Sequence, residues 1–465
     1  MATFDEYKNF DAMGLAKLVK EKQVSPEELL DTAIEILEVE NPKINSIAIK
    51  MFDEARDSIK SGLPDGPFKG VPFLLKEYDT YKGIPTTFAS KFMENNIPNI
   101  DSELVSRYKK AGFVIIGKTN APEFGIGGTT ESTFYGPSRN PFDNHCSSGG
   151  SSGGSAASIA AGIVPAANGS DAGGSIRMPA SSCGIIGLKP TRGRVPMGPL
   201  KSEGRGGLSV SNVMSRSLRD TAAILDLISG PDVGAAYWPE LPNKPYLQEL
   251  RSPEKPLRIA YSIKNIWDVN SDIECIDAVM NTVKKLESFG HEIIPDPIKI
   301  DSEKYTQATI DLIAGDLCHK IEMYGKKKKV TPLPDFFDDH IWSTYQYGLK
   351  LSALDYVNAL HNIQNIGRKV AYGFENIDIY ITPVMSKPPL KIGELFEHVN
   401  DVQKFYLNMW KYQTGFTGLF NASGNPAISL PLHRTSNGLP VGVQLVSKYS
   451  REDTLFQVSQ SLLNE

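Results

Sequence analysis

The sequence predicts an α/β fold, because strand-like and helix-like segments alternate in its first part and strand-like runs recur towards its end. Residues 70–76 and 113–117 are short apolar runs typical of buried strands, and residues 102–111 between them have helical character. Three further runs predict strands near the C-terminus, at 377–382, 427–430 and 441–446. At 465 residues the chain has room for a large hydrophobic core.

The first predicted element is a helix that begins after Ser25. Ser25 and Glu28 have the spacing of a capping box, and Pro26 occupies the first helical position. Apolar residues then follow at helical spacing. We expect Asn41 and Pro42 to end this helix, because the residue before a proline avoids the helical conformation.

The middle of the chain divides into a glycine-rich part and a helical part. Residues 124–207 are rich in Gly, Ser, Pro and Ala, but apolar runs that a flexible linker would not need interrupt them. This part therefore predicts ordered loops wrapped around a site. Residues 215–380 predict mainly helices, with the lysine run at 326–329 in a solvated loop. A last helix is predicted from Glu452.

Composition and charge exclude several classes of function. The net charge of −5 and the charged fraction of 22% give no basic surface for nucleic acid or for an anionic membrane. The N-terminus lacks the apolar region of a signal peptide, and no apolar run is long enough to span a bilayer. The 4 cysteines are widely spaced without a CxxC pair, which predicts reduced thiols, no metal site and a cytoplasmic location.

The densest chemical signal lies in two Gly/Ser segments, at 149–157 and 171–179. In the second, a row of backbone N–H groups precedes Ser175, and such a row can converge on an oxyanion beside a serine nucleophile. We therefore predict Ser175 as a nucleophile. The predicted oxyanion-hole donors are the N–H groups of Ala172, Gly173, Gly174 and Ser175. The segments contain neither the GxxxxGK[ST] phosphate-binding motif nor the GxSxG motif of α/β-hydrolases.

A serine nucleophile needs a base, and the residues alone leave two kinds of base open. Of the 7 histidines, His145 is the one near the Gly/Ser segments. Lys76 is the alternative, because it ends an apolar strand where burial would favour its neutral form. Lys118 and Lys189 are rival lysines.

Residues around the predicted nucleophile favour structural roles. Ser152 and Ser155 are expected to form hydrogen bonds within the loop or to pack there, and Cys183 is expected in the core. Arg177 is predicted to brace the loop by binding backbone carbonyls or a carboxylate, with Asp171 as the candidate partner.

Taken together, these motifs resemble the amidase signature family. The strongest matches are residues 70–79, 117–128, 148–190 and 421–444. The resemblance implies a single domain over residues 1–465, with a mixed β-sheet core covered by helices on both faces. It is weakest at about 235–376, where it implies a variable, mainly helical substrate-pocket region.

The resemblance also implies a Ser–Ser–Lys triad. Ser175 matches the acyl-accepting serine, Ser151 the bridging serine that is usually held by a cis peptide bond, and Lys76 the base. Asn120 and Glu123 match a loop that lines the acyl site. The substrate-binding positions implied in that loop are Gly125, Ile126 and Gly127. No metal ion and no cofactor are implied.

The function implied is hydrolysis of carbon–nitrogen amide bonds through a covalent acyl-enzyme. Residues 119–125 and 138–141 are similar to those of bacterial amidases related to nylon-oligomer cyclic-dimer hydrolases and urethanases, which extends the expected substrates to linear amides, cyclic amides and carbamates. The expected partner is such a small molecule, and the family allows a homodimer. Two alternatives stay open: the glutaminase subunit of a tRNA-dependent amidotransferase, or a non-catalytic binding member of the fold.

Overall fold

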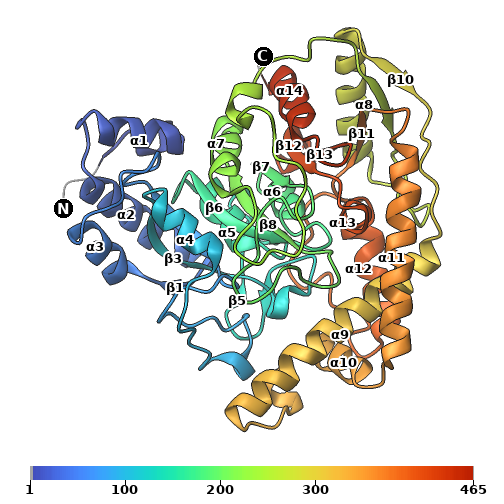
Figure 1. Ribbon diagram of the computed structural model, residues 1–465, viewed down its shortest axis with the longest axis horizontal. Coiled ribbons are helices and arrows are strands. Elements are labelled where there is room, and N and C mark those ends of the chain that lie inside the picture. The colour runs from blue at the N-terminus through green and yellow to red at the C-terminus, as the bar shows by residue number, and fades with distance from the viewer. Residues whose placement is uncertain (1–3, 464–465) are drawn as a thin grey trace.

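The central feature of the fold is a mixed β-sheet of 11 strands (Figure 1). The computed structural model describes residues 4–463, so residues 1–3 and 464–465 of the predicted domain lie outside the described residues. The strand order is β1-β3-β2-β6-β8-β7-β12-β13-β11-β9-β10. These strands are β1 (Ile47–Lys50), β2 (Pro72–Lys76), β3 (Val114–Thr119), β6 (Ala166–Asp171), β7 (Ile186–Lys189), β8 (Val210–Ser215), β9 (Arg258–Tyr261), β10 (Glu292–Ile294), β11 (Ile379–Pro383), β12 (Ala427–Arg434) and β13 (Pro440–Ser447). A separate short hairpin consists of β4 (Glu131–Ser132) and β5 (Gly136–Pro137).

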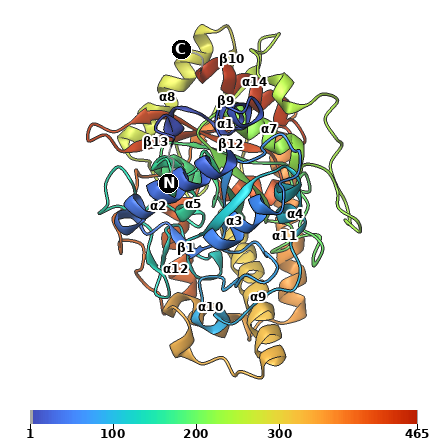
Figure 2. The same cartoon turned by 90° about the vertical axis from the view of Figure 1, so that its left-hand side faces the viewer.

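Helices cover both faces of this sheet, as predicted (Figure 1, Figure 2). They are α1 (Ala12–Lys20), α2 (Pro26–Ile44), α3 (Phe52–Lys60), α4 (Glu103–Lys110), α5 (Gly153–Ala160), α6 (Arg177–Ser182), α7 (Leu218–Ile228), α8 (Ile273–Ser288), α9 (Ser302–Lys328), α10 (Asp339–Gly348), α11 (Ala353–Gly373), α12 (Val402–Met409), α13 (Gly418–Ser423) and α14 (Glu452–Leu463). Successive side chains of a strand point to opposite faces. Along β11, Ile379 and Ile381 join a core that includes α8 and α14, whereas Tyr380 joins a second core with α9 and α11.

The connections between β2, β3 and β6 position the site. These three strands run parallel, with β2 in the middle. The crossover through α4 and the crossover through α5 therefore leave in opposite directions along the sheet, and the right-handed rule puts the two helices on opposite faces. Because β2 and β6 run parallel, their carboxyl ends lie at the same edge of the sheet. Ligands bind at this edge in open α/β sheets.

Most of the predicted elements are present. Helix α2 begins with the predicted capping box, in which Ser25 Oγ accepts a hydrogen bond from the N–H of Glu28 and the Glu28 carboxylate accepts one from the N–H of Ser25. The strands β2, β3, β11, β12 and β13 and the helices α4 and α14 lie where the periodicity predicts them, within a few residues at their ends.

The predicted end of α2 is wrong, because the helix continues through Pro42 to Ile44. A proline in the last turn removes one N–H donor, and other groups complete this end of the helix. The backbone carbonyl of Asn41 still accepts a hydrogen bond from Asn45 at 2.7 Å. The Asn41 side chain accepts another from the N–H of Ser46, and Asn45 ends the helix in the left-handed conformation.

Two further predictions need correction. Residues 124–207 are not only loops, because they contain α5, β6, α6 and β7. The small residues permit close packing: a Cβ on Gly154 would lie 2.5 Å from the backbone nitrogen of Asn120. The lysine run at 326–329 is exposed, as predicted, but it forms the last turn and the cap of α9 rather than a loop. Cations are favourable at that end of a helix.

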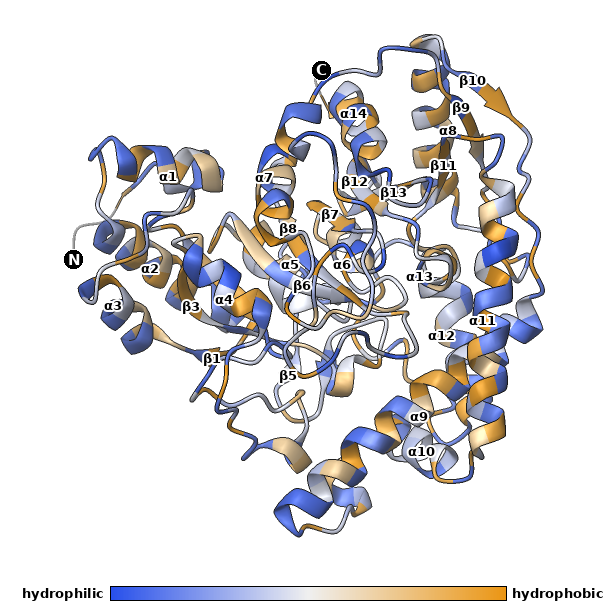
Figure 3. Ribbon diagram, viewed as in Figure 1, coloured by the Kyte–Doolittle hydropathy of each residue, from blue (hydrophilic) through white to orange (hydrophobic). Residues whose placement is uncertain are grey.

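Residues 215–380 are mainly helical, as predicted, and include the long helices α9 and α11. Figure 3 shows hydrophobic and hydrophilic residues mixed along α9 and α11, whose buried residues contribute to the cores described above.

Among residues 4–463, no helix combines the length and the apolar character needed to cross a membrane. All 4 cysteines are free thiols, in agreement with the prediction from their spacing.

Candidate active site

Three chain segments meet at the carboxyl edge of β2 and β6. Lys76 is the last residue of β2, and Ser170 and Asp171 end β6. Ser151 lies just before α5, and Ser175 lies in the turn between β6 and α6. The structure therefore brings together the three residues that the resemblance implies as a triad, although they come from separate parts of the sequence.

Lys76 is the centre of a short hydrogen-bond network. Its Nζ lies 2.7 Å from Ser151 Oγ and 3.0 Å from Ser170 Oγ, and the residue is 0% exposed. Burial lowers the pKa of Lys76 from 10.5 to about 7, and the positive charge of Arg205 contributes in the same direction. Lys76 thus has the geometry and the electrostatics of a base that is partly neutral near pH 7.

The chain around Ser151 has the conformation that the resemblance implies. The peptide bond between Gly150 and Ser151 is cis. Thr130 holds this turn, because its hydroxyl donates a hydrogen bond to the carbonyl of Gly149 at 2.8 Å. Gly125 lies opposite, where a Cβ would be 3.6 Å from Ser151 Oγ.

Ser175 lies in the same cavity as Ser151 and is 9% exposed. Its backbone carbonyl accepts a hydrogen bond from the N–H of Ser152 at 3.2 Å, which ties the two Gly/Ser segments together. No hydrogen bond joins the hydroxyls of Ser151 and Ser175 within residues 4–463. Catalytic hydrogen bonds are often long in the absence of substrate and tighten in the complex.

The backbone before Ser175 supplies fewer free donors than the sequence predicts. The N–H of Gly174 donates to Asp171 Oδ1 at 2.8 Å, so this group is already engaged. The described contacts leave the N–H groups of Ala172, Gly173 and Ser175 without such a partner. These three groups are therefore the ones with capacity to bind an oxyanion.

A buried ion pair braces this turn. Arg177 donates to both carboxylate oxygens of Asp171, at 3.0 and 2.9 Å, and to the backbone carbonyl of Thr417 at 2.9 Å, as predicted for a brace. It also donates to the side chains of Gln444 and Asn421. Burial alone would raise the pKa of Asp171, but the Arg177 charge and its hydrogen bonds outweigh burial and hold that pKa below its usual range.

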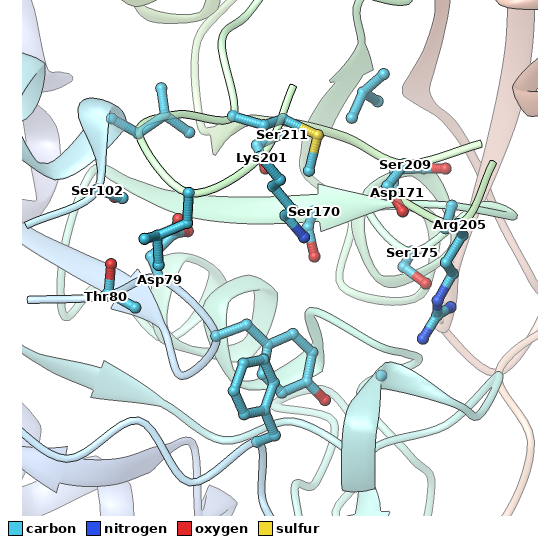
Figure 4. A pocket seen from close by; sticks show the side chains of 18 of the residues that line it. Asp79, Thr80, Ser102, Ser170, Asp171, Ser175, Lys201, Arg205, Ser209 and Ser211 are labelled. Carbon is cyan, nitrogen blue, oxygen red and sulfur yellow. The ribbon is translucent and has the colours of Figure 1, made fainter. Parts of the chain in front are cut away.

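The cavity has a volume of about 300 Å³ (Figure 4). Its lining includes residues that sequence reasoning missed, namely Tyr78, Asp79, Ser170, Lys201, Arg205 and Lys320. One wall is the segment 196–211. Lys320 is the one lining residue from the predicted pocket region at 235–376. Ser170 had a usable signal, because it neighbours Asp171 at the start of a Gly/Ser segment, and Tyr78 and Asp79 lie within the matched residues 70–79.

The rival bases lie elsewhere. Lys118 Nζ donates to the carbonyl of Pro85 at 2.7 Å, and Lys189 Nζ to the carbonyl of Pro190 at 2.8 Å. His145 is exposed, and none of these three residues lines the cavity. Lys76 is not a lining residue either, but of these candidates it is the one whose side chain lies within hydrogen-bond distance of Ser151.

The remaining predicted residues lie either beside the Gly/Ser segments or in the loop after β3. Ser152 and Ser155 donate to backbone carbonyls of β6, at 3.2 and 2.8 Å, and Cys183 is buried, so these three have structural roles. In the loop after β3, Gly125 lines the cavity, whereas Ile126 and Gly127 are buried and do not.

Asn120 and Glu123 brace that loop from outside the cavity. The Asn120 side chain donates to the carbonyls of Asn45 and Gly136, at 3.1 and 3.0 Å. The Glu123 carboxylate accepts a hydrogen bond from the N–H of Asp338 at 2.7 Å. Both residues therefore hold the loop in place, and neither lines the cavity.

Comparison with known proteins gives consistent matches over nearly the whole chain. The Amidase family model matches residues 28–456. A 6-aminohexanoate-cyclic-dimer hydrolase of Paenarthrobacter ureafaciens is 35% identical, over 97% of this chain and 94% of its own. A glutamyl-tRNA(Gln) amidotransferase subunit of Sulfurihydrogenibium sp. is 33% identical, over 96% of this chain and 95% of its own. A solved structure of a 6-aminohexanoate cyclic dimer hydrolase with substrate superposes with a TM-score of 0.93 at 33% identity, covering 99% of this chain and 97% of that one.

Proposed function

This chain belongs to the amidase family and is an amidohydrolase, and from that premise we propose that it cleaves amides through a Ser–Ser–Lys triad and a covalent acyl-enzyme. The observation that carries the proposal is the 2.7 Å contact between Lys76 Nζ and Ser151 Oγ, because Ser151 lines the same cavity as Ser175. A neutral lysine at that distance can take a proton from a serine hydroxyl.

The proposed reaction begins with two proton transfers. Neutral Lys76 accepts the proton of Ser151, and Ser151 accepts the proton of Ser175 as Ser175 Oγ attacks the carbonyl carbon. The N–H groups of Ala172, Gly173 and Ser175 then stabilise the negative charge on the carbonyl oxygen. Gly174, whose N–H binds Asp171, contributes by shaping this turn.

In the second half of the reaction, the same groups first return a proton to the leaving group and then assist hydrolysis of the ester. Ser151 returns a proton to the leaving nitrogen, because an amine leaves poorly unless it is protonated. Water then hydrolyses the ester formed at Ser175, and Lys76 again accepts the proton through Ser151. A pKa of about 7 suits Lys76 for both directions at neutral pH.

We propose small linear or cyclic amides as substrates, and carbamates as a further class. The support is the identity of 35% to a protein described as a 6-aminohexanoate-cyclic-dimer hydrolase. The test is a panel of aryl amides, linear and cyclic aliphatic amides and carbamates, with the Ser175→Ala variant as the blank. Turnover that exceeds the blank for at least one amide supports the proposal, and a panel without any such turnover contradicts it.

The glutaminase subunit of a tRNA-dependent amidotransferase is the second candidate, because the glutamyl-tRNA(Gln) amidotransferase relative is 33% identical over 96% of this chain. Such a subunit needs partner proteins, and co-purification with one would favour this candidate. Robust hydrolysis of simple amides by the isolated chain would exclude it. A non-catalytic binding role is disfavoured by the contact between Lys76 and Ser151, and labelling of Ser175 by a fluorophosphonate would exclude it.

The wider organisation is proposed on the same basis. Residues 235–376 form the variable part of a single domain and reach the cavity through Lys320. The 4 free thiols support a cytoplasmic location. A homodimer remains a prediction from the resemblance.

A further inference from the structure

One wall of the cavity carries an excess of positive charge. Lys201 and Arg205 extend into the cavity from the segment 196–211 (Figure 4), and Lys320 reaches it from α9. The proposed amide cleavage needs none of these three cations as a proton donor or acceptor. Arg205 lowers the pKa of Lys76, but Lys201 and Lys320 have no role in the cleavage described so far.

The nearby carboxylates do not neutralise these cations. Asp316 lies 2.5 Å from Lys320 Nζ and 3.7 Å from Arg205 Nε, so two cations share one carboxylate. Arg205 is further fixed by a hydrogen bond from its Nη2 to the carbonyl of Phe124 at 2.7 Å. Within residues 4–463, Lys201 forms no ion pair.

Neither of the two acidic side chains that line the cavity forms an ion pair with Lys201 among the described residues. Asp171 is paired with Arg177. Burial raises the pKa of Asp79 and so favours its neutral form, against the charges of Lys118, Lys76 and Lys201. An anion that enters the cavity therefore meets Lys201 as an available partner.

We propose that this wall binds a carboxylate of the substrate, so that the preferred amides are anionic rather than neutral. The inference deepens the proposed amidohydrolase function and rests on it. Lys201 binds the carboxylate, and Arg205 and Lys320 provide a positive field around it. A charge-assisted hydrogen bond of this kind is stronger than a neutral one.

The substrate class follows from the size and chemistry of the cavity. A cavity of about 300 Å³ holds a small molecule. The proposed substrates are therefore short linear amides that carry a carboxylate away from the reacting carbonyl, either on the acyl chain or on the amine. A neutral cyclic amide gains nothing from Lys201.

The experiment measures binding to the Ser175→Ala variant, which separates recognition from turnover. Two matched pairs cover both positions of the carboxylate: succinanilic acid against the anilide of levulinic acid, and para-acetamidobenzoate against para-acetamidoacetophenone. In each pair the neutral ketone replaces the carboxylate. We expect the anionic member of at least one pair to bind about tenfold more tightly at low ionic strength, and added salt to reduce this preference.

The variant Lys201→Gln in the same background is expected to reduce the preference about fivefold or more. Lys255→Gln is the matched control, because Lys255 is exposed and does not line the cavity. Equal binding within both pairs overturns the inference, and so does a preference that survives Lys201→Gln. Hydrolysis of the neutral anilides by the native enzyme is read separately, so failure of the carboxylate site is distinguishable from failure of the proposed function.

Discussion

The proposed role of Lys76 as a base predicts a pH profile with an ascending limb near pH 7. The change in its pKa from 10.5 to about 7 corresponds to about 5 kcal/mol of destabilisation of the ammonium form in the folded protein. About half of Lys76 is then neutral at pH 7, whereas an ordinary lysine would be about 0.03% neutral. For a neutral anilide, kcat/KM should rise through pH 7 as one group loses its proton, and should level off above about pH 8.

Arg205 provides the perturbation that tests this assignment. It is the second cause of the lowered pKa, after burial. The Arg205→Gln variant removes that positive charge, so the pKa of Lys76 should rise and the ascending limb should move to higher pH. The position of the limb is the readout, because loss of the hydrogen bond to Phe124 also affects the absolute rate.

The control for this experiment is Arg258→Gln, which removes an exposed guanidinium that does not line the cavity. The ascending limb of the pH profile of this variant should lie at the same pH as that of the native enzyme. The reasoning is refuted if Arg205→Gln leaves the limb unmoved or shifts it to lower pH.

Three further substitutions test the site. Ser151→Ala should lower kcat/KM by about 100- to 10,000-fold while the Tm stays within a few degrees, because the proton relay is lost and the packing is not. Arg177→Met should lower the free energy of unfolding in urea by about 3–5 kcal/mol, because Asp171 is left buried and unpaired; an unchanged value would contradict its role as a brace. Gly125→Ala places a Cβ 2.9 Å from the ring of Tyr78 at a φ of +69°, and steady-state kinetics should show a fall in kcat/KM of about tenfold or more.

The sequence was most informative where a local pattern determines a local structure. The capping box at Ser25 and the apolar run before Lys76 predict a helix start and a strand end that the structure contains. The prediction at Pro42 failed because hydrogen bonds of Asn41 and Asn45 complete the helix beyond the proline. Such compensation depends on particular contacts, and no general rule for proline includes them.

The site itself was only partly readable. The Gly/Ser motifs indicate Ser175, and the family resemblance adds Ser151, but neither indicates Arg205, whose charge helps to lower the pKa of Lys76 from another segment. Likewise, the sequence shows four successive N–H groups, from Ala172 to Ser175. Only the structure shows that the N–H of Gly174 already donates a hydrogen bond to Asp171. Long-range electrostatics and donor occupancy arise from the fold, so sequence spacing does not predict them.

The central claim is that Ser175 forms the covalent intermediate, and peptide mass spectrometry tests it most directly. The folded enzyme would be treated with a fluorophosphonate, or quenched in acid during turnover of an activated amide, and then digested. The account predicts one adduct, which fragmentation of the labelled peptide assigns to Ser175, with no adduct in Ser175→Ala and slower labelling in Lys76→Met. An adduct on Ser151 or Ser170, or unchanged labelling of Ser175→Ala, would contradict the account.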